Sequence, residues 1–293
     1  VTEIGMCAFS GCSSLKSIDI PDSVTKIGGG AFVGCSSLEG IKVSRNNSVY
    51  KSVEGILYDK KMTSIIRFPI KHNNVAFVIP NSVSTIENGA FDWCWSLKSI
   101  CLPNGLTSIS ESMFEHSRIK SIDIPNSVET IGPSAFSGCD SLVSVTMPNT
   151  ITSIGDYAFY GCGELRDLKI PNRITHIGRK VFARCNCAIN IPEGVVSVGP
   201  GAFADHLFTT RIIVPLSVKE LGYGAFANCG VLCREGLKLQ TTIEYAGTKQ
   251  QWAQIQREEY DNSTDVFNIQ CVDGMIEATV TPDEELERPI VVL

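Results

Sequence analysis

The stretch SIDIPNSVETIGPSAFSGCDSL, residues 121–142, is a template, and almost every other part of the 293-residue chain is an edited copy of it. Its apolar positions are two isoleucines before a proline, a valine, another isoleucine, an Ala-Phe pair, a cysteine and a leucine. A period of about 23 residues indicates a repeat array whose stacked coils share one core. The repeat phenylalanine marks nine copies, at Phe9, Phe32, Phe91, Phe114, Phe136, Phe159, Phe182, Phe203 and Phe226.

Each repeat holds two short stretches with β-strand character. The first, for example Ser121–Ile124, alternates inward isoleucine with outward polar residues, which is the period of a half-buried strand. A proline then ends the strand. The second stretch ends in a glycine such as Gly132, which predicts a tight bend with positive φ, although Glu87 and Ser110 replace that glycine in two copies. A short helical turn over SAFSGC is expected to follow and to place Phe and Cys inward.

An insertion of about 36 residues lengthens the step between Phe32 and Phe91. It covers roughly residues 44–74 and contains VEGILYDKKMTSIIRF. Ile56–Tyr58 and Ser64–Phe68 read as a hairpin with a polar turn. Its aromatic residues either form an exposed contact surface or pack the hairpin onto the array; these residues are Tyr50, Tyr58 and Phe68.

The template decays after Cys229, which divides the chain into three predicted parts. Residues 1–236 are expected to form the solenoid, residues 237–272 a C-terminal cap, and residues 273–293 a tail or an extra edge strand. Thr248 and Gln251 form a capping box that predicts a helix over about Thr248–Glu258, and a strand is expected near Val266–Val272. Such a cover is needed because an open end exposes core and unpaired strand edges.

Seven of the twelve cysteines follow the repeat phenylalanine by three residues and so form a row with one thiol per coil. Coils stack about 4.8 Å apart, whereas a disulfide needs Cβ atoms about 3.8 Å apart that converge. A linear row also does not supply the four converging ligands of a zinc site. We therefore expect small buried residues whose S–H groups donate to backbone carbonyls. Cys101, outside the row, is expected to be exposed.

Composition and spacing argue against several functional classes. The formal charge of −6 is spread over interleaved acidic and basic residues, so there is no basic stripe for nucleic acid. No apolar run approaches the eighteen or so residues of a membrane-spanning helix. The histidines lie at unrelated repeat positions, which suggests surface residues and not a catalytic triad; these are His72, His116, His176 and His206. We expect no enzyme activity, cofactor or metal.

The outward positions of the first strands are the candidate binding surface. If those strands form one parallel sheet, these positions make a continuous face of mixed charge, which is either a recognition surface or ordinary solvated sheet. The candidate residues are Lys16, Asp19, Lys42, Lys98, Lys120, Asp123, Arg166 and Lys169 on the sheet, with Tyr58 on the insertion.

With this template the chain resembles the BspA-like, or treponemal-type, leucine-rich repeat family. The resemblance rests on LKSIDIPDSVTKIGGGAFVGCSSL at residues 15–38, its copies through Cys229, the insertion VEGILYDKKMTSIIRFP and the closing YAGTKQQWAQI, and it covers about residues 1–272. It implies a leucine-rich-repeat solenoid, mainly β with short helical turns, with a parallel sheet on one face and a capping helix and strand.

The resemblance also implies a function and a location. Members of the family are secreted or surface-exposed proteins, mostly of host-associated bacteria, that adhere to host matrix proteins or to other cells. The expected partner is therefore a protein, and the expected location is extracellular or at the cell surface. The alternative is a structural spacer that presents another domain absent from this chain.

Overall fold

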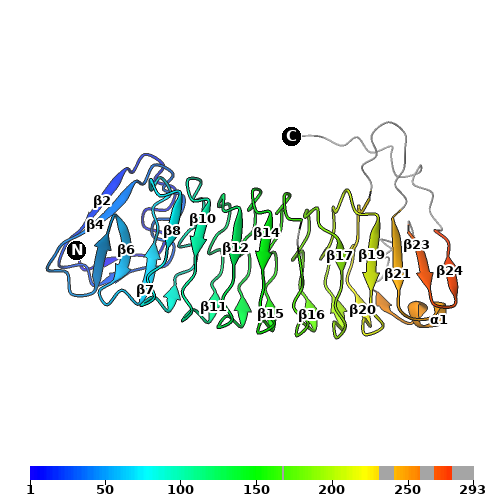
Figure 1. Cartoon of the computed structure of the whole chain (residues 1–293). Coiled ribbons are helices and arrows are strands. Elements are labelled where there is room, and N and C mark those ends of the chain that lie inside the picture. The colour runs from blue at the N-terminus through cyan, green and yellow to red at the C-terminus, as the bar shows by residue number, and fades with distance from the viewer. Residues whose placement is uncertain (167, 231–240, 258–266, 279–293) are drawn as a thin grey trace.

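The chain folds as an elongated β-solenoid in which successive repeats form stacked coils, as the computed structural model shows (Figure 1). The structure describes residues 1–166, 168–230, 241–257 and 267–278. Most coils contribute two short strands, one to each of two sets of sheets that run along the stack. The stacked repeats, the mainly β character and the parallel strand pairing confirm the predicted fold class.

The strands at the first position of each repeat, most of which precede a proline, form the first face of the solenoid. They are β2 (Ser17–Ile20), β4 (Gly40–Val43), β8 (Ala76–Val78), β10 (Ser99–Cys101), β12 (Ser121–Asp123), β14 (Ser144–Thr146), β17 (Ile189–Asn190), β19 (Arg211–Val214), β21 (Thr242–Tyr245) and β23 (Asn268–Cys271). Neighbours pair in parallel, with Asp123 beside Thr146 for example. The sequence predicts one continuous sheet, but these strands form three, β2-β4, β8-β10-β12-β14 and β17-β19-β21-β23. The insertion separates β4 from β8 along the chain, and residues 168–170 form no strand.

The strands at the second position of each repeat, most of which follow a proline, form the second face. They are β1 (Glu3–Ile4), β3 (Lys26–Ile27), β9 (Thr85–Ile86), β11 (Ser108–Ile109), β13 (Thr130–Ile131), β15 (Ser153–Ile154), β16 (His176–Ile177), β18 (Ser197–Val198), β20 (Glu220–Leu221) and β22 (Gln256–Arg257). They also pair in parallel and in register, as Ile109 with Ile131 and Ile131 with Ile154. Each strand is short because the coil turns at once into the bend.

The glycine at this bend is required by close packing, which corrects the predicted reason for it. Gly132 does not have a positive φ. A Cβ atom at Gly132 would lie 2.7 Å from the backbone nitrogen of Glu111 in the preceding coil, and the equivalent distance at Gly155 is 2.5 Å, to the nitrogen of Pro133. Neighbouring coils therefore approach too closely for a side chain at this point.

The segment after the bend is a series of tight turns and not the predicted helical turn. The N–H of Ser137 donates to the oxygen of Ser134 over 3.0 Å, and that of Cys139 donates to the oxygen of Phe136 over 3.1 Å. Ser134 and Gly138 have φ angles of 53° and 67°, values that an α-helix does not contain. Phe136 and Cys139 are nevertheless fully buried, so the inward direction of both side chains is confirmed.

Stacked phenylalanines form the centre of the core. Neighbouring ring centroids from Phe68 to Phe226 are 5.0 to 5.9 Å apart. Phe9 and Phe32 form a separate stack at 5.8 Å. The buried residues likewise divide into two clusters, a small one around Phe32 and a large one from Ile56 onward. We call the coils around Phe9 and Phe32 the N-terminal block, and the coils from Phe68 onward the main array.

The insertion joins the two parts. Its strands are β5 (Tyr50–Val53), β6 (Ile56–Asp59) and β7 (Ser64–Arg67), which form an antiparallel sheet whose last strand pairs in parallel with β9. The predicted hairpin is confirmed as β6 and β7. Tyr58 is only 2% exposed, and the other two aromatic residues are buried as well, so the prediction of Tyr58 as an exposed binding residue is wrong. The hairpin packs its aromatic side chains inward because both parts of the core extend under it.

At the other end of the solenoid, the structure contains the predicted capping box. The Thr248 hydroxyl accepts the N–H of Gln251, and the Gln251 side chain accepts the N–H of Thr248. The helix that follows, α1 (Lys249–Ala253), is shorter than predicted because the chain continues as β22, which pairs with β20. Beyond β23, β24 (Gly274–Ile276) pairs antiparallel with it. Residues 258–266 and 279–293 lie outside the described residues, and the role of this end as a cover stays a prediction.

Candidate functional site

The coil-to-coil register places the predicted sheet residues at defined positions. Asp19 pairs with Lys42 in the N-terminal block. In the main array, the N–H of Lys120 donates to the oxygen of Lys98 over 3.0 Å, so these two lysines occupy the same position in adjacent coils. Val143 follows in that row and Arg166 follows Val143, through backbone hydrogen bonds of 2.8 and 3.0 Å. All eight predicted sheet residues are exposed, whereas Tyr58 is buried.

The structure divides these eight residues into groups. Lys16, Asp19 and Lys42 lie on or beside the two-stranded sheet of the N-terminal block, while the other five lie on the main array beyond the insertion. Lys98, Lys120 and Arg166 form what we call the basic row of the main array, which Val143 interrupts between Lys120 and Arg166. Like charges on neighbouring strands destabilise a sheet slightly, so the fold itself does not favour this row.

An exposed aromatic patch lies next to that row and was missed by sequence reasoning. It consists of Trp93, Trp95 and His116. The Trp93 and Trp95 rings meet nearly at right angles with centroids 5.9 Å apart, and the Trp93 ring stacks on His116 at 4.1 Å. Trp93 and Trp95 are 38% and 44% exposed. Trp95 precedes Lys98 by three residues, so the patch adjoins the basic row.

The backbone at Trp93 is unusual for so large a residue. Its φ is 56°, and His116 has a φ of 55° at the same position of the next coil. In the template this position is the glycine of the GC pair, for example Gly138. The left-handed conformation costs a bulky residue about 1–2 kcal/mol relative to glycine. The signal available in the sequence was therefore the replacement of that glycine by tryptophan.

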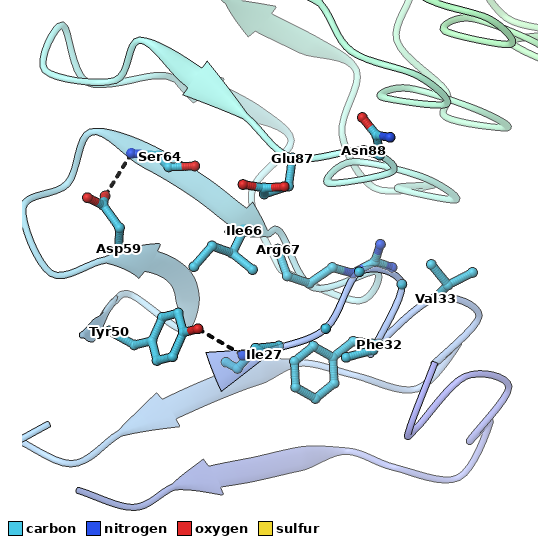
Figure 2. A pocket seen from close by; sticks show the side chains of 14 residues that line it. Ile27, Phe32, Val33, Tyr50, Asp59, Ser64, Ile66, Arg67, Glu87 and Asn88 are labelled. Atoms are coloured by element: carbon cyan, nitrogen blue, oxygen red, sulfur yellow. Dashed lines mark hydrogen bonds between the residues drawn. The ribbon is translucent and has the colours of Figure 1, made fainter. Parts of the chain in front are cut away.

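A pocket of about 390 Å³ separates the N-terminal block from the main array (Figure 2). One wall is the bend Gly28–Val33 of the block. The other wall comes from the insertion and the next coil, and includes Ser64, Arg67, Glu87 and Asn88. In Figure 2 the Tyr50 hydroxyl bonds to the backbone nitrogen of Ile27, and the Arg67 side chain extends toward the glycine bend.

Arg67 is the basic group of this pocket. It is 4% exposed, and its Nη1 donates to the oxygen of Gly89 over 2.6 Å and to the Asp92 carboxylate. Nε and Nη2 of Arg67 have no hydrogen-bond partner, and neither does Oγ of Ser64. Burial raises the pKa of the Asp92 carboxyl although Arg67 opposes the rise. Unpaired buried donors of this kind are rare and unfavourable.

Six of the seven cysteines in the row are buried and donate to a backbone oxygen as predicted, whereas Cys12 in the first coil is exposed. The Sγ atom of Cys139 donates to the oxygen of Phe114 over 3.0 Å, and that of Cys162 donates to the oxygen of Phe136 over 3.2 Å. All described cysteines are free thiols, and Cys101 is exposed, which confirms that prediction. Burial raises the pKa of Cys139 to about 12, so this thiol stays protonated and unreactive. Cys233 lies outside the described residues.

His206 takes the place of a cysteine in this row. It is fully buried, and its Nε2 lies 2.7 Å from the oxygen of Phe182, the same type of contact that the cysteines make. Burial lowers the pKa of its imidazole. His72 is buried too, with Nε2 2.7 Å from the oxygen of Glu54. The prediction of four surface histidines is therefore wrong for these two, because their rings replace packing groups.

The described residues contain neither a metal-binding cluster nor a membrane-spanning helix. No group of three or more His, Cys, Asp or Glu side chains is positioned there to hold a metal ion. In the same part of the chain, no helix has the length and apolar character needed to cross a membrane.

Comparison with known proteins agrees with the fold. The family model described as the BspA type leucine rich repeat region matches residues 1–76, 68–188 and 187–250, in six copies. A leucine-rich repeat protein from Eubacterium ventriosum has a similar structure, with a TM-score of 0.71 and 26% identity over 80% of this chain and 64% of its own. The pneumococcal vaccine antigen PcpA matches with a TM-score of 0.57 and 19% identity over 96% of this chain and 60% of its own.

These matches cover only part of the proteins compared. The chain spans less than two thirds of the length of either solved structure, and no curated protein matches the chain. The similarity to PcpA therefore shows the fold alone. Repeat solenoids of this type present extended surfaces that are typical of protein interaction.

Proposed function

Because the chain belongs to the BspA-type leucine-rich repeat family, we propose that it is a secreted or surface-exposed protein that binds another protein in adhesion to host matrix or to other cells. The binding surface in this proposal is the aromatic patch together with the basic row of Lys98, Lys120 and Arg166. The observation that carries it is the exposed, left-handed Trp93, because the other residues that replace the template glycine at this repeat position are polar, namely His116, Arg184, Asp205 and Asn228.

The chemistry of this surface supports protein recognition. Tryptophan and arginine are enriched among the residues that dominate binding energy, and such residues cluster around a desolvated centre. Exposed lysines around that centre steer an acidic partner and speed its association. Strain at a residue that the fold does not need points to a functional role. Lys16, Asp19 and Lys42 lie on the separate N-terminal sheet and are proposed as a second, smaller contact region.

The test measures binding of the chain to immobilised host matrix proteins and to whole bacterial cells. The double variant Lys98→Glu with Lys120→Glu reverses two charges on exposed side chains and is expected to lower affinity at least tenfold. A matched control, Arg173→Glu with Arg179→Glu, makes the same charge change away from the first face, at two exposed residues. If both double variants lose affinity equally, the loss results from net charge and not from the basic row. If no matrix protein or cell is retained at micromolar concentration, the proposal is contradicted.

A further inference from the structure

The pocket between the N-terminal block and the main array is an independent site. Its volume of about 390 Å³ falls in the range of small-molecule sites, which favour boundaries between packed units. We propose that it binds a small zwitterion, a molecule with one carboxylate and one ammonium group, of which a free amino acid is the simplest. This inference does not depend on the proposed partner surface.

Backbone donors on the block side of the pocket lack the partners that their equivalents have. In the main array the N–H of Ser134 donates to the oxygen of Asp156 over 2.9 Å, and that of Phe136 donates to the oxygen of Ala158 over 2.7 Å. Gly30 and Phe32 occupy the same positions in the last coil of the block, where the insertion interrupts the stack. In the described part of the chain, neither of their N–H groups has a hydrogen-bond acceptor, and both residues line the pocket.

The insertion side supplies further donors. Nε and Nη2 of the buried Arg67 have no partner, and the same guanidinium is fixed through Nη1 by Gly89 and Asp92. A guanidinium beside backbone N–H groups suits a carboxylate, which accepts paired hydrogen bonds from such a fork. The pocket is therefore lined by residues with unpaired donors, the backbone N–H groups of Gly30 and Phe32 and the solvent-shielded Nε and Nη2 of Arg67. One carboxylate of a ligand pairs with the backbone groups directly and with the guanidinium once the Arg67 side chain turns toward it.

The charges around the pocket decide against a simple anion. The carboxyl groups of Asp59 and Glu87 belong to residues that line the pocket, and that of Asp92 pairs with the single guanidinium, Arg67. Asp59 is already satisfied, because Thr63 and Ser64 donate to it over 2.6 to 2.8 Å. Glu87 is exposed and lines the pocket, and within the described part of the chain its carboxylate has no hydrogen bond or ion pair. Phosphate or sulfate would meet this acidic rim unfavourably, whereas an ammonium group pairs with Glu87.

The test is calorimetric titration of the full chain with glycine, alanine and 4-aminobutanoate, which place the two charges at different separations. The control ligands are acetate, which has only a carboxylate, methylammonium, which has only an ammonium group, and phosphate, which has neither. We expect one zwitterion to bind with unit stoichiometry and at least tenfold more tightly than acetate or phosphate. Equal affinity for acetate would overturn the proposal, as would the absence of millimolar binding by every zwitterion.

Two variants locate the binding. Glu87→Gln removes the rim charge from an exposed side chain and is expected to weaken zwitterion binding at least tenfold while leaving acetate binding unchanged or stronger. Arg67→Lys keeps a positive charge beside Asp92 but removes the fork, and should weaken both ligands. Glu129→Gln, at an exposed residue of the main array, is the control and should bind as the parent does. Unchanged zwitterion affinity in Glu87→Gln would refute the assignment even if Arg67→Lys failed to fold.

Discussion

The main array and the N-terminal block use the same repeat but differ in how completely each coil is covered. Phe136 is sandwiched between Phe114 and Phe159, at 5.3 and 5.0 Å, and is fully buried. Phe9 stacks on one side only and remains partly exposed. The insertion then interrupts the stack after Phe32. In a solenoid, therefore, the stability of a coil depends on its neighbours and not on its own sequence alone.

The largest expected effect comes from removing a central ring. Phe136→Ala creates a cavity between two rings that are held by their own coils, and we expect a loss of about 3–5 kcal/mol in unfolding free energy. Phe9→Ala removes a ring with one stacking partner and should cost about 1–2 kcal/mol. Urea unfolding followed by circular dichroism compares the two. Equal losses would show that the block and the array are equally well covered.

A second prediction concerns the block itself. Asn47 is fully buried and makes four hydrogen bonds: Nδ2 donates to the oxygens of Pro21 and Val24, each at 2.8 Å, and Oδ1 accepts the N–H groups of Val49 and Tyr50 at 2.9 and 2.8 Å. Asn47→Ala leaves these groups unpaired and should destabilise the block by about 2–3 kcal/mol.

Hydrogen exchange distinguishes a local from a global effect of that substitution. We expect faster exchange of amides in residues 3–50 and unchanged exchange around Phe159, because the two parts have separate cores. Asn46→Ala is the control, since Asn46 is exposed. Faster exchange throughout the main array would mean that the two parts unfold as one unit.

The same contrast explains what the sequence could predict. The strands, the inward Phe136 and the hydrogen-bonded cysteines could be predicted because the residue pattern within each repeat determines them. The reason for Gly132 did not, because the limiting contact is with Glu111 in another coil. The sequence left Tyr58 between an exposed contact surface and packing onto the array, because nothing in the insertion itself reveals that the hairpin covers two cores.

The candidate site shows the same limit. Eight of the nine predicted binding residues are exposed, since alternation along a strand predicts which side chains point outward. The grouping of those residues depends on where the sheets break, and the pocket at Arg67 depends on the interrupted stack. Neither is a property of one repeat. Trp93 was visible in the sequence only as a missing glycine, and its exposure and its stacking on His116 required the structure.

A smaller, pH-dependent effect is expected at His206, the substitute in the cysteine row. Burial lowers the pKa of its imidazole, although Asp205 acts in the opposite direction. The unfolded chain therefore binds a proton more readily than the folded one, and stability is retained above about pH 6.5 and lost as the pH falls toward the lowered value. His206→Cys restores the template residue and should remove this loss, which amounts to about 1.4 kcal/mol when the folded pKa lies one unit below the unfolded pKa.

The measurement for His206 compares urea midpoints at about pH 7.5 and 5.5 for parent and variant. His176→Asn is the control, because His176 is exposed on the second face. A parent and a His206→Cys variant that lose equal stability on acidification would assign the effect to other groups.

The smallest effect on stability, and the most informative for function, is expected from Trp93→Gly. Glycine relieves the left-handed strain of about 1–2 kcal/mol but loses the contact with His116, worth about 0.5–1.5 kcal/mol, so unfolding free energy should change by less than about 1 kcal/mol. Binding to the protein partner should nevertheless fall at least tenfold, as removal of a central tryptophan usually causes.

Tyr157→Gly provides the matched control for Trp93→Gly. Tyr157 has a φ of 60° and is a half-buried aromatic residue in contact with Tyr160, two coils beyond the patch. The same relief of strain is therefore expected there, with partner binding unchanged. If both glycine variants bind the partner as the parent does, Trp93 is a tolerated irregularity of the turn and the partner docks elsewhere on the first face. If only Trp93→Gly loses binding while both remain folded, the strain at Trp93 is retained for recognition.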